Sequence, residues 1–279
     1  MDKQKKIMIV AKQNPLGIQL ARALARKIEG KCDYIFDPST SMRLRKRGTS
    51  IKRFDGDFII TLGGDGTFLR ASHQTNLPIL PVKLEGHGFL CTCTYKELEL
   101  NINRVLKGNF TVGERTRLKC TKIREGRVDR YLGRILKKEY PLSLNEIAFG
   151  RKRPSKILHI ELTIDGTLFN FSGDGLMVST PTGSTAYNSS AGGSLIDPEL
   201  EAISVIPLYP FYSKIKPMIV PASKKLEVTV HGDCALIVDG HEGDYFKDEA
   251  TFIIEKGEPV KVIHLSPQRF YERFKNEFL

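Results

Sequence analysis

The segment Gly63-Gly64-Asp65-Gly66-Thr67 places a single carboxylate in a turn that consists almost entirely of glycine. The apolar run at residues 57–62 predicts a β-strand before it, and residues 68–73 predict a helix start after it. Such glycine turns present backbone N–H groups to phosphate and allow its close approach. Because a carboxylate repels phosphate, Asp65 indicates proton transfer or a metal ion. An ordinary strand-to-helix turn is the alternative, but it accounts less well for both preceding glycines and Thr67.

A second segment rich in small polar residues runs from Gly173 to Gly193 and reads GDGLMVSTPTGSTAYNSSAGG. Its apolar part, residues 176–179, predicts a strand that runs into a turn at residues 181–183. A short helix is then expected from Ser184 to about Gly192, with N-terminal N–H groups available to a phosphate and with Tyr187 offering a flat face to a base or ribose. A flexible linker is the alternative, but the preceding hydrophobic strand and the aromatic residue argue against it.

Up to residue 107 the sequence alternates between strand and helix patterns. Strands are predicted at residues 7–11, 34–36, 57–62 and 77–82. Helices are predicted at residues 15–28 and, after a capping box at Thr94 and Glu97, to about Leu106; the basic stretch 41–53 is expected to be a loop. The alternation predicts a Rossmann-like α/β domain with a parallel sheet. In such sheets ligands bind at the carboxyl ends of the strands, which is where Asp65 lies.

After Gly108 the sequence becomes β-rich. Asp165-Gly166 separates two strand patterns and predicts a tight hairpin. Further short strands are predicted at residues 174–180, 203–206, 226–230, 235–239, 251–255 and 260–265. Together they predict a β-sandwich, followed by a final helix that begins at Ser266-Pro267 and packs back on the first domain through Phe270, Phe274 and Phe278. We therefore expect an α/β domain at residues 1–108 and 266–279 and a β-rich domain at residues 109–265.

The composition indicates a globular chain with ample core. It has 279 residues, of which 41% are hydrophobic and 27% charged, as is typical of soluble proteins of one or two domains. No apolar run reaches the length of a transmembrane helix, so no membrane association is expected. The five cysteines have no paired spacing, and an odd number suits a reducing compartment. We therefore expect buried free thiols and a cytoplasmic protein.

The formal net charge of +11 is concentrated in two clusters. They comprise Arg43, Arg45, Lys46, Arg47, Lys52 and Arg53, and then Arg151, Lys152, Arg153 and Lys156. A nucleic-acid-binding protein would have such clusters, and so would a protein that attracts anionic nucleotides by its field; a solvated lysine-rich surface is a third interpretation. No helix-turn-helix, zinc-finger spacing or aromatic RNA-binding run accompanies the charge, so a small anionic ligand ranks above nucleic acid.

Taken together, these segments resemble the NAD kinase family, whose members phosphorylate NAD to NADP. The resemblance rests on GGDGT at residues 63–67, Asn145-Glu146, the long segment at 174–193 and Val238-Asp239-Gly240. GGDGT alone also occurs in relatives of diacylglycerol and sphingosine kinases, so the segment at 180–193 is the more specific feature. The family fold, an α/β domain plus a β-sandwich with a returning C-terminal helix, agrees with the elements predicted above.

The resemblance implies a role for each of these positions. Asp65 corresponds to the catalytic carboxylate that accepts the proton of the 2′-hydroxyl of the adenosine ribose, and phosphates would lie against the turn formed by Gly63, Gly64, Gly66 and Thr67. Asn145 and Glu146 correspond to the pair that binds the adenosine end of NAD. The nicotinamide half is expected at Asp174, Thr185, Ala186, Tyr187, Asn188, Ser189 and Ser190. Lys156 corresponds to a basic position that reaches a neighbouring subunit's ligand, and His241 to a late ligand contact.

The resemblance also implies the substrates NAD and ATP (or polyphosphate), Mg²⁺ carried with the nucleotide, and a homo-oligomer, either a dimer or a tetramer. Residues 83–90 read KLEGHGFL and keep only the Gly-Phe-Leu end of the family's Asn-x-Gly-x-Leu-Gly-Phe-Leu, so this loop's contacts do not carry over. A lipid kinase that shares GGDGT is one alternative. A non-enzymatic nucleotide- or nucleic-acid-binding protein is the other, and the presence of Asp65 argues against it.

Overall fold

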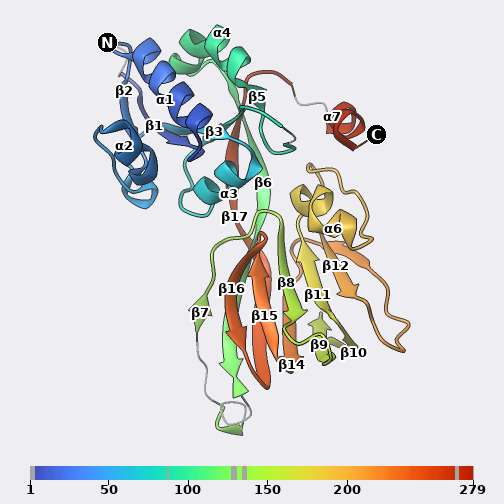
Figure 1. Ribbon diagram of the computed structural model, residues 1–279. Helices are drawn as coiled ribbons and strands as arrows, with labels where there is room; N and C mark the ends of the chain where they lie inside the picture. The colour runs from blue at the N-terminus through green and yellow to red at the C-terminus, as the bar shows by residue number, and fades with distance from the viewer. Residues whose placement is uncertain (1–3, 87, 127–130, 134–136, 268–269, 279) are drawn as a thin grey trace. The chain divides into compact units, whose positions relative to one another are not determined.

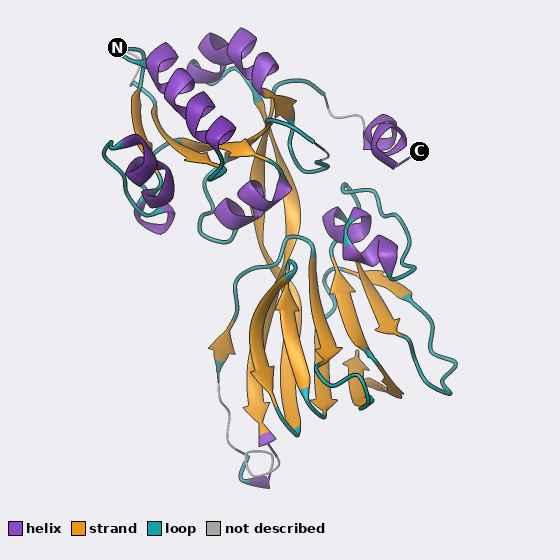
Figure 2. Ribbon diagram, in the orientation of Figure 1, coloured by secondary structure: helices purple, strands orange, loops and turns teal. Residues whose placement is uncertain are grey.

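The computed structural model describes residues 4–86, 88–126, 131–133, 137–267 and 270–278 (Figure 1). The chain divides into two compact units, one formed by residues 1–114 with 260–279 and the other by residues 115–259. Most helices belong to the first unit, whereas the second consists mainly of strands (Figure 2). Two long strands, β6 (Thr111–Glu125) and β17 (Glu249–His264), run from one unit into the other.

The first unit contains a parallel sheet with the strand order β4-β3-β1-β2. Its strands are β1 (Lys6–Ala11), β2 (Asp33–Phe36), β3 (Phe58–Gly63), β4 (Ile79–Lys83) and the short β5 (Cys93–Thr94). Its helices are α1 (Pro15–Ile28), α2 (Pro38–Leu44), the 3₁₀ turn η1 (Ile51–Arg53), α3 (Asp65–Ser72), α4 (Tyr95–Leu106) and α7 (Phe270–Phe278). The Rossmann-like α/β class predicted from the sequence is confirmed.

Local signals explain the two longest helices. Asn14 caps α1 by accepting a hydrogen bond from the Gly17 amide at 2.9 Å, and Pro15 occupies the first turn, where no amide is needed. Ala21, Leu24 and Ile28 bury the inner face of α1 against the sheet. The capping box of Thr94 predicted for α4 is present.

Two expectations for this unit are wrong. The stretch 41–53 is not a loop throughout, because α2 and η1 occupy part of it. Pro38 pre-sets the first turn of α2, Arg45 ends the helix in the left-handed conformation at φ 53°, and burial of Leu44 and Ile51 outweighs the surrounding charge. Helix α3 begins at Asp65 itself rather than at Phe68, so the carboxylate lies in the first turn of a helix.

The second unit is a sandwich of two sheets. One has the order β13-β12-β11-β8-β15-β16, and the other includes β10-β9-β14-β17 with β6. The strands are β7 (Lys138–Glu139), β8 (Glu146–Arg151), β9 (Leu158–Ile164), β10 (Thr167–Gly173), β11 (Gly175–Ser179), β12 (Ala202–Leu208), β13 (Met218–Pro221), β14 (Leu226–His231), β15 (Cys234–Val238) and β16 (His241–Phe246). Phe252 lies in the core between Phe149 and Phe246, with ring centroids 4.9 and 5.2 Å away.

The predicted hairpin is present between β9 and β10, where Asp165 and Gly166 both have positive φ, 49° and 75°. The two strands expected at 251–255 and 260–265 are one continuous strand, β17, whose middle residues between 255 and 259 lack an apolar pattern. Strands β13 and β16 have no counterpart among the predicted strands, because their residues are half exposed.

The C-terminal helix α7 contacts its own unit, as the sequence predicts. The Phe270 ring packs edge-on against Phe89, with 5.6 Å between the centroids. The described helix begins at Phe270; residues 268–269 and the side chain of Phe278 lie outside the described part. All five cysteines are buried and free, as expected. Among the described residues, no helix is both long and apolar enough to cross a membrane.

Candidate active site

Asp65 stands directly after β3, at the carboxyl end of the parallel sheet. Its carboxylate accepts hydrogen bonds from two successive amides, Phe89 N at 2.8 Å and Leu90 N at 2.9 Å. These amides belong to the loop that follows β4, the strand that pairs with β3. Because each carboxylate oxygen has further lone pairs, both oxygens can still accept a proton or a hydroxyl hydrogen bond.

The three glycines around Asp65 serve different purposes. A Cβ atom on Gly63 would lie 2.2 Å from Thr67 Oγ1, so this glycine permits the first turn of α3 to close. A Cβ atom on Gly64 or Gly66 would meet nothing within 4 Å, which leaves open space beside the backbone. None of the three has a positive φ. Within the protein, only Gly63 therefore requires the absence of a side chain, whereas Gly64 and Gly66 keep the space beside the backbone free.

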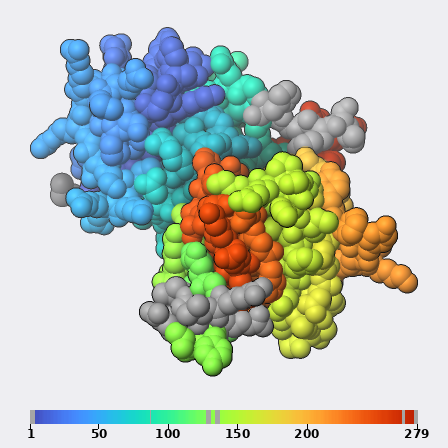
Figure 3. Space-filling view, turned by 60° about the horizontal axis from the view of Figure 1, so that its bottom comes forward, coloured from blue at the N-terminus to red at the C-terminus, as the bar shows by residue number. Residues whose placement is uncertain are grey.

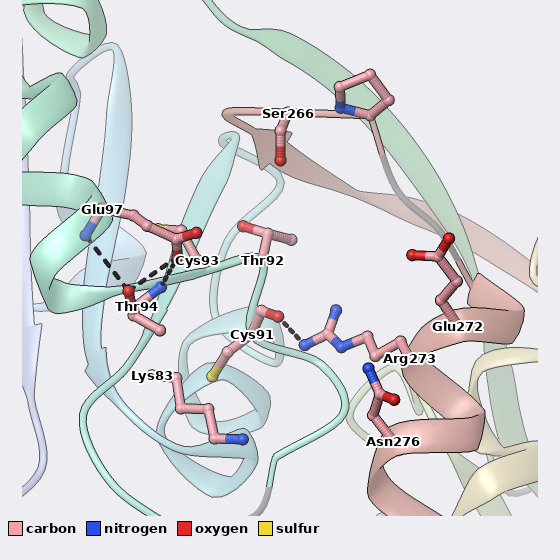
Figure 4. A pocket seen from close by; sticks show the side chains of 11 residues that line it. Lys83, Cys91, Thr92, Cys93, Thr94, Glu97, Ser266, Glu272, Arg273 and Asn276 are labelled. Atoms are coloured by element: carbon pink, nitrogen blue, oxygen red, sulfur yellow. Dashed lines mark hydrogen bonds between the residues drawn. The ribbon is translucent and has the colours of Figure 1, made fainter.

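A cavity of about 500 Å³ lies on the other side of the same loop. Figure 4 shows the side chains that line it, among them Lys83, Thr92, Glu97 and Arg273. Cys91 also borders it, and its Sγ lies 3.9 Å from Asp65 Oδ1. Burial, reinforced by the charge of Asp65, raises the pKa of Cys91 to about 12, so this thiol stays protonated and does not act as a nucleophile.

In the second unit, one buried carboxylate organises the predicted pair Asn145-Glu146. Asp239 is only 4% exposed and has φ 48°. It accepts hydrogen bonds from Ser143 Oγ at 2.6 Å and from the amides of Leu144 at 2.9 Å and Asn145 at 2.7 Å. The Val-Asp-Gly motif that contains Asp239 is visible in the sequence, but its role is not, since the two segments are separated by about ninety residues.

Both members of the pair present an unused acceptor. Asn145 Oδ1 and Glu146 Oε2 are buried and have no hydrogen-bond partner within the protein. Burial, reinforced by the charge of Asp239 and opposed by the Gly240 amide, raises the pKa of Glu146 to about 7. Buried acceptors are normally paired, so two unpaired ones on adjacent residues fit a ligand that supplies the donors.

Glu146→Gln is expected to stabilise the protein more at pH 8 than at pH 5. Folding raises the pKa of Glu146 from 4.5 to about 7, so between these two pH values the folded protein binds a proton that the unfolded chain has lost. The free energy of unfolding of the wild type therefore falls as the pH rises from 4.5 to about 7. The shift corresponds to at most about 3 kcal/mol. Thermal unfolding of Glu146→Gln, with the exposed Glu227→Gln as control, measures the effect. An equal change in melting temperature at both pH values would contradict the buried, protonated carboxyl.

The Thr-Pro-Thr-Gly part of the long motif packs on the backbone of this pair. Thr180 Oγ1 donates to Leu144 O at 2.5 Å, and the Thr180 amide donates to Asn145 O at 2.9 Å. A Cβ atom on Gly183 would lie 2.1 Å from Asn145 O, so only glycine fits there. The motif therefore fixes the position of Asn145, which sequence spacing alone does not indicate.

The single helix expected from Ser184 to Gly192 is wrong. The structure has a 3₁₀ turn η2 (Thr182–Thr185) and a separate four-residue helix α6 (Tyr187–Ser190). The break follows from Asn188, which is fully buried and whose Nδ2 donates to Ser184 O and Ser194 O, both at 3.1 Å. With one turn, α6 cannot supply the helix N-terminus that was expected to bind phosphate.

The remaining predicted residues divide between two places. Tyr187, Ser189 and Ser190 are exposed, Thr185 and Ala186 are partly exposed, and His241 Nδ1 lies 3.0 Å from Asp239 O, so all six belong to the same end of the sandwich as Asn145. Asp174 lies at the opposite end of β11, about 17 Å away along the strand, where Arg151 pairs with it at 3.0 Å. Lys156 follows in the exposed turn after β8 at that far end.

Comparison with known proteins decides the family. The model of the ATP-NAD kinase N-terminal domain matches residues 4–110, and that of the ATP-NAD kinase C-terminal domain matches residues 144–265. The chain belongs to the NAD kinase family. It is 36% identical over 211 residues to the NAD kinase of Pyrococcus furiosus, which covers 74% of this chain and 72% of that protein.

Solved structures agree with the NAD kinase assignment. An NAD kinase from Archaeoglobus fulgidus in complex with ATP has a TM-score of 0.73 and 25% identity, covering 98% of this chain and 97% of that one. Yeast NADH kinase complexed with NADH has a TM-score of 0.88, covering 100% of this chain and 88% of that one; at 21% identity it shows the fold alone. The predicted α/β domain with a β-sandwich and a C-terminal helix is thus the NAD kinase fold.

Proposed function

We propose that this NAD kinase transfers a phosphoryl group from ATP, or another polyphosphate donor, to the 2′-hydroxyl of the adenosine ribose of NAD, giving NADP. The observation that carries the proposal is the pair of buried, unpartnered acceptors, Asn145 Oδ1 and Glu146 Oε2, in a chain that matches both family domains. A lipid alcohol has no base or ribose to occupy them. Mass spectrometry of the product, which should be NAD plus one phosphoryl group, tests the reaction.

In this proposal Asp65 is the catalytic base and accepts the proton of the attacking hydroxyl. Two amides fix its carboxylate, and the open space at Gly64 and Gly66 leaves room for phosphate against the backbone. In phosphoryl transfer the protein contributes mainly by positioning the reacting groups and by neutralising the charge of the phosphates.

The residues around Asp65 fit a Mg²⁺ ion that is bound mainly by the phosphates of the nucleotide. Within the described residues no group of three or more His, Cys, Asp or Glu side chains could hold a metal, and Mg²⁺ keeps waters and phosphate oxygens as most of its ligands. When bound, the ion would neutralise phosphate charge, and Asp65 is the carboxylate near enough to the glycine turn to supply one oxygen ligand.

The second unit is proposed as the NAD-binding part, with Tyr187, Ser189, Ser190 and His241 as further contacts, and the first unit as the part that holds Asp65. We also propose a cytoplasmic homo-oligomer. The position of Lys156 supports the oligomer, because this exposed side chain follows β8 at the end far from Asn145, where it would be available to a second copy's ligand. Sedimentation velocity tests this, and a monomer at all concentrations would contradict it.

The first basic cluster is proposed to attract the anionic donor. Its six side chains are all exposed (light blue region in Figure 3). Within the described part of the chain, none of the six forms an ion pair. In the second cluster, by contrast, Arg151 pairs with Asp174, Arg153 pairs with Asp233 at 2.6 Å, and Lys152 lies over the Tyr245 ring.

Replacing Arg43 and Arg47 by glutamine is therefore expected to raise the KM for ATP several-fold at low ionic strength, and less at high salt, because mobile ions screen the field. The control is Arg22→Gln with Arg26→Gln, which removes the same charge from exposed positions on α1. Steady-state kinetics over a salt series measure the effect. An unchanged KM together with lost RNA binding would favour nucleic acid as the partner of this cluster.

A further inference from the structure

The loop that holds Asp65 is itself held from its other side by the C-terminal helix. Arg273 of α7 donates from Nη2 to Cys91 O and, at 3.4 Å, to Gly88 O. Its guanidinium also lies 5.4 Å from the centre of the Phe89 ring. The backbone of residues 88–91 is therefore held from two sides. Asp65 accepts hydrogen bonds from its amides, and Arg273 donates hydrogen bonds to its carbonyls.

Arg273 and the loop residue Cys91 both line the cavity beside this loop. A space of about 500 Å³ lies beside the loop and is lined by Cys91 and, among others, by Glu97, Ser266 and Asn276 (Figure 4). Arg273 is the side chain that bridges from α7 to Cys91 O in that view. Phe270 adds one edge-on aromatic contact to Phe89. The hydrogen bonds from this guanidinium therefore link the backbone of the loop directly to α7.

The loop approaches Asp65 closely enough for its position to matter. A Cβ atom on Gly88 would lie 3.1 Å from Asp65 Oδ1, so there is no spare room between backbone and carboxylate. If residues 88–91 move, the two amides that orient the carboxylate move with them. The geometry points to Arg273 as a positioning residue that orients the carboxylate of Asp65 through the loop 88–91.

This inference rests on the proposed function, in which Asp65 is the base, but its first test does not depend on activity. Arg273→Ala is expected to speed hydrogen exchange of the Phe89 and Leu90 amides at least tenfold, because their hydrogen bonds to Asp65 open more often. Lys275→Ala removes an exposed cation from the same helix and should leave both amides unchanged. Unchanged exchange in Arg273→Ala would overturn the inference.

The second test measures turnover. Arg273→Ala is expected to lower kcat about tenfold while the KM values for NAD and ATP stay within twofold, since positioning acts on the reacting group rather than on binding. Arg273→Lys restores one donor and should recover part of the rate. Added guanidinium at low millimolar concentration, which can enter the vacated cavity, should do the same for Arg273→Ala. A kcat loss that merely follows a loss of folded protein in thermal melts, with no rescue, would contradict the positioning role.

A double-variant cycle decides whether Arg273 acts through Asp65. In the Asp65→Asn background, Arg273→Ala should lower kcat less than twofold, because the group that it positions is already gone. Equal effects of Arg273→Ala in both backgrounds would mean that the helix acts elsewhere. Wild-type turnover of Asp65→Asn alone would overturn the proposed base, whereas faster amide exchange in Arg273→Ala would still establish the link between α7 and the loop.

Discussion

Asp65→Asn is expected to lower kcat by about 10² to 10⁴, because it removes the group that accepts the proton of the ribose hydroxyl. A loose transition state needs less help from a base, so a loss near 10² agrees with the proposal. NAD affinity should change less than threefold. The measurement is a coupled assay with glucose-6-phosphate dehydrogenase, which responds to NADP, with the exposed Asp55→Asn as control.

Asparagine keeps only one acceptor oxygen, so one of the amides of Phe89 and Leu90 loses its partner in this variant. That loss costs about 1–3 kcal/mol of stability, and thermal melts must therefore accompany the kinetics. A folded Asp65→Asn variant with wild-type turnover would exclude Asp65 as the base.

Asn145→Ala and Glu146→Ala are expected to weaken NAD binding by about ten- to a hundredfold and to leave ATP binding nearly unchanged. Each variant removes an acceptor that the protein itself does not use, so a donor on NAD would be left unpaired at a cost of roughly 1–3 kcal/mol. Glu146→Ala also leaves the Gly240 amide without its carboxylate partner, so thermal melts must accompany the titrations. Separate calorimetric titrations of NAD and ATP measure the two affinities.

The matched control for this pair is Asn170→Ala, an exposed amide on β10 of the same unit. Its NAD affinity should equal that of the wild type. Equal losses for NAD and ATP in Asn145→Ala, or a large loss of stability, would mean that the pair supports the fold and does not recognise the acceptor.

Much of the fold could be predicted because local patterns agree with tertiary packing. Asn14 with Pro15 defines the start of α1, and Asp165-Gly166 defines the β9–β10 hairpin, since both depend on contacts within a few residues. The sequence does not predict helix α2, because the helix is only seven residues long and contains several small polar residues, with Leu44, Thr40 and Ser41 as its buried residues. The signal that could have found it is Pro38 after Asp37.

The sequence predicts the individual residues of the candidate site, but it does not predict the hydrogen bonds that hold them in place. GGDGT and Asn145-Glu146 are recognisable as short motifs. The support of Asp65 by the loop at 88–91, and of Asn145 by Asp239, depends on hydrogen bonds between segments that are far apart in sequence. The same holds for Asn188, which looks like one more polar residue in its motif but is buried and bonded to Ser184 and Ser194.

The central claim is that the purified chain makes NADP from NAD. The most direct measurement incubates it with NAD, ATP and Mg²⁺ and follows NADP with glucose-6-phosphate dehydrogenase, in parallel with a diacylglycerol phosphorylation assay. We expect NADP to form with wild type and at least a hundredfold more slowly with Asp65→Asn, and diacylglycerol to remain unmodified. Phosphorylation of diacylglycerol without NADP formation would contradict the account.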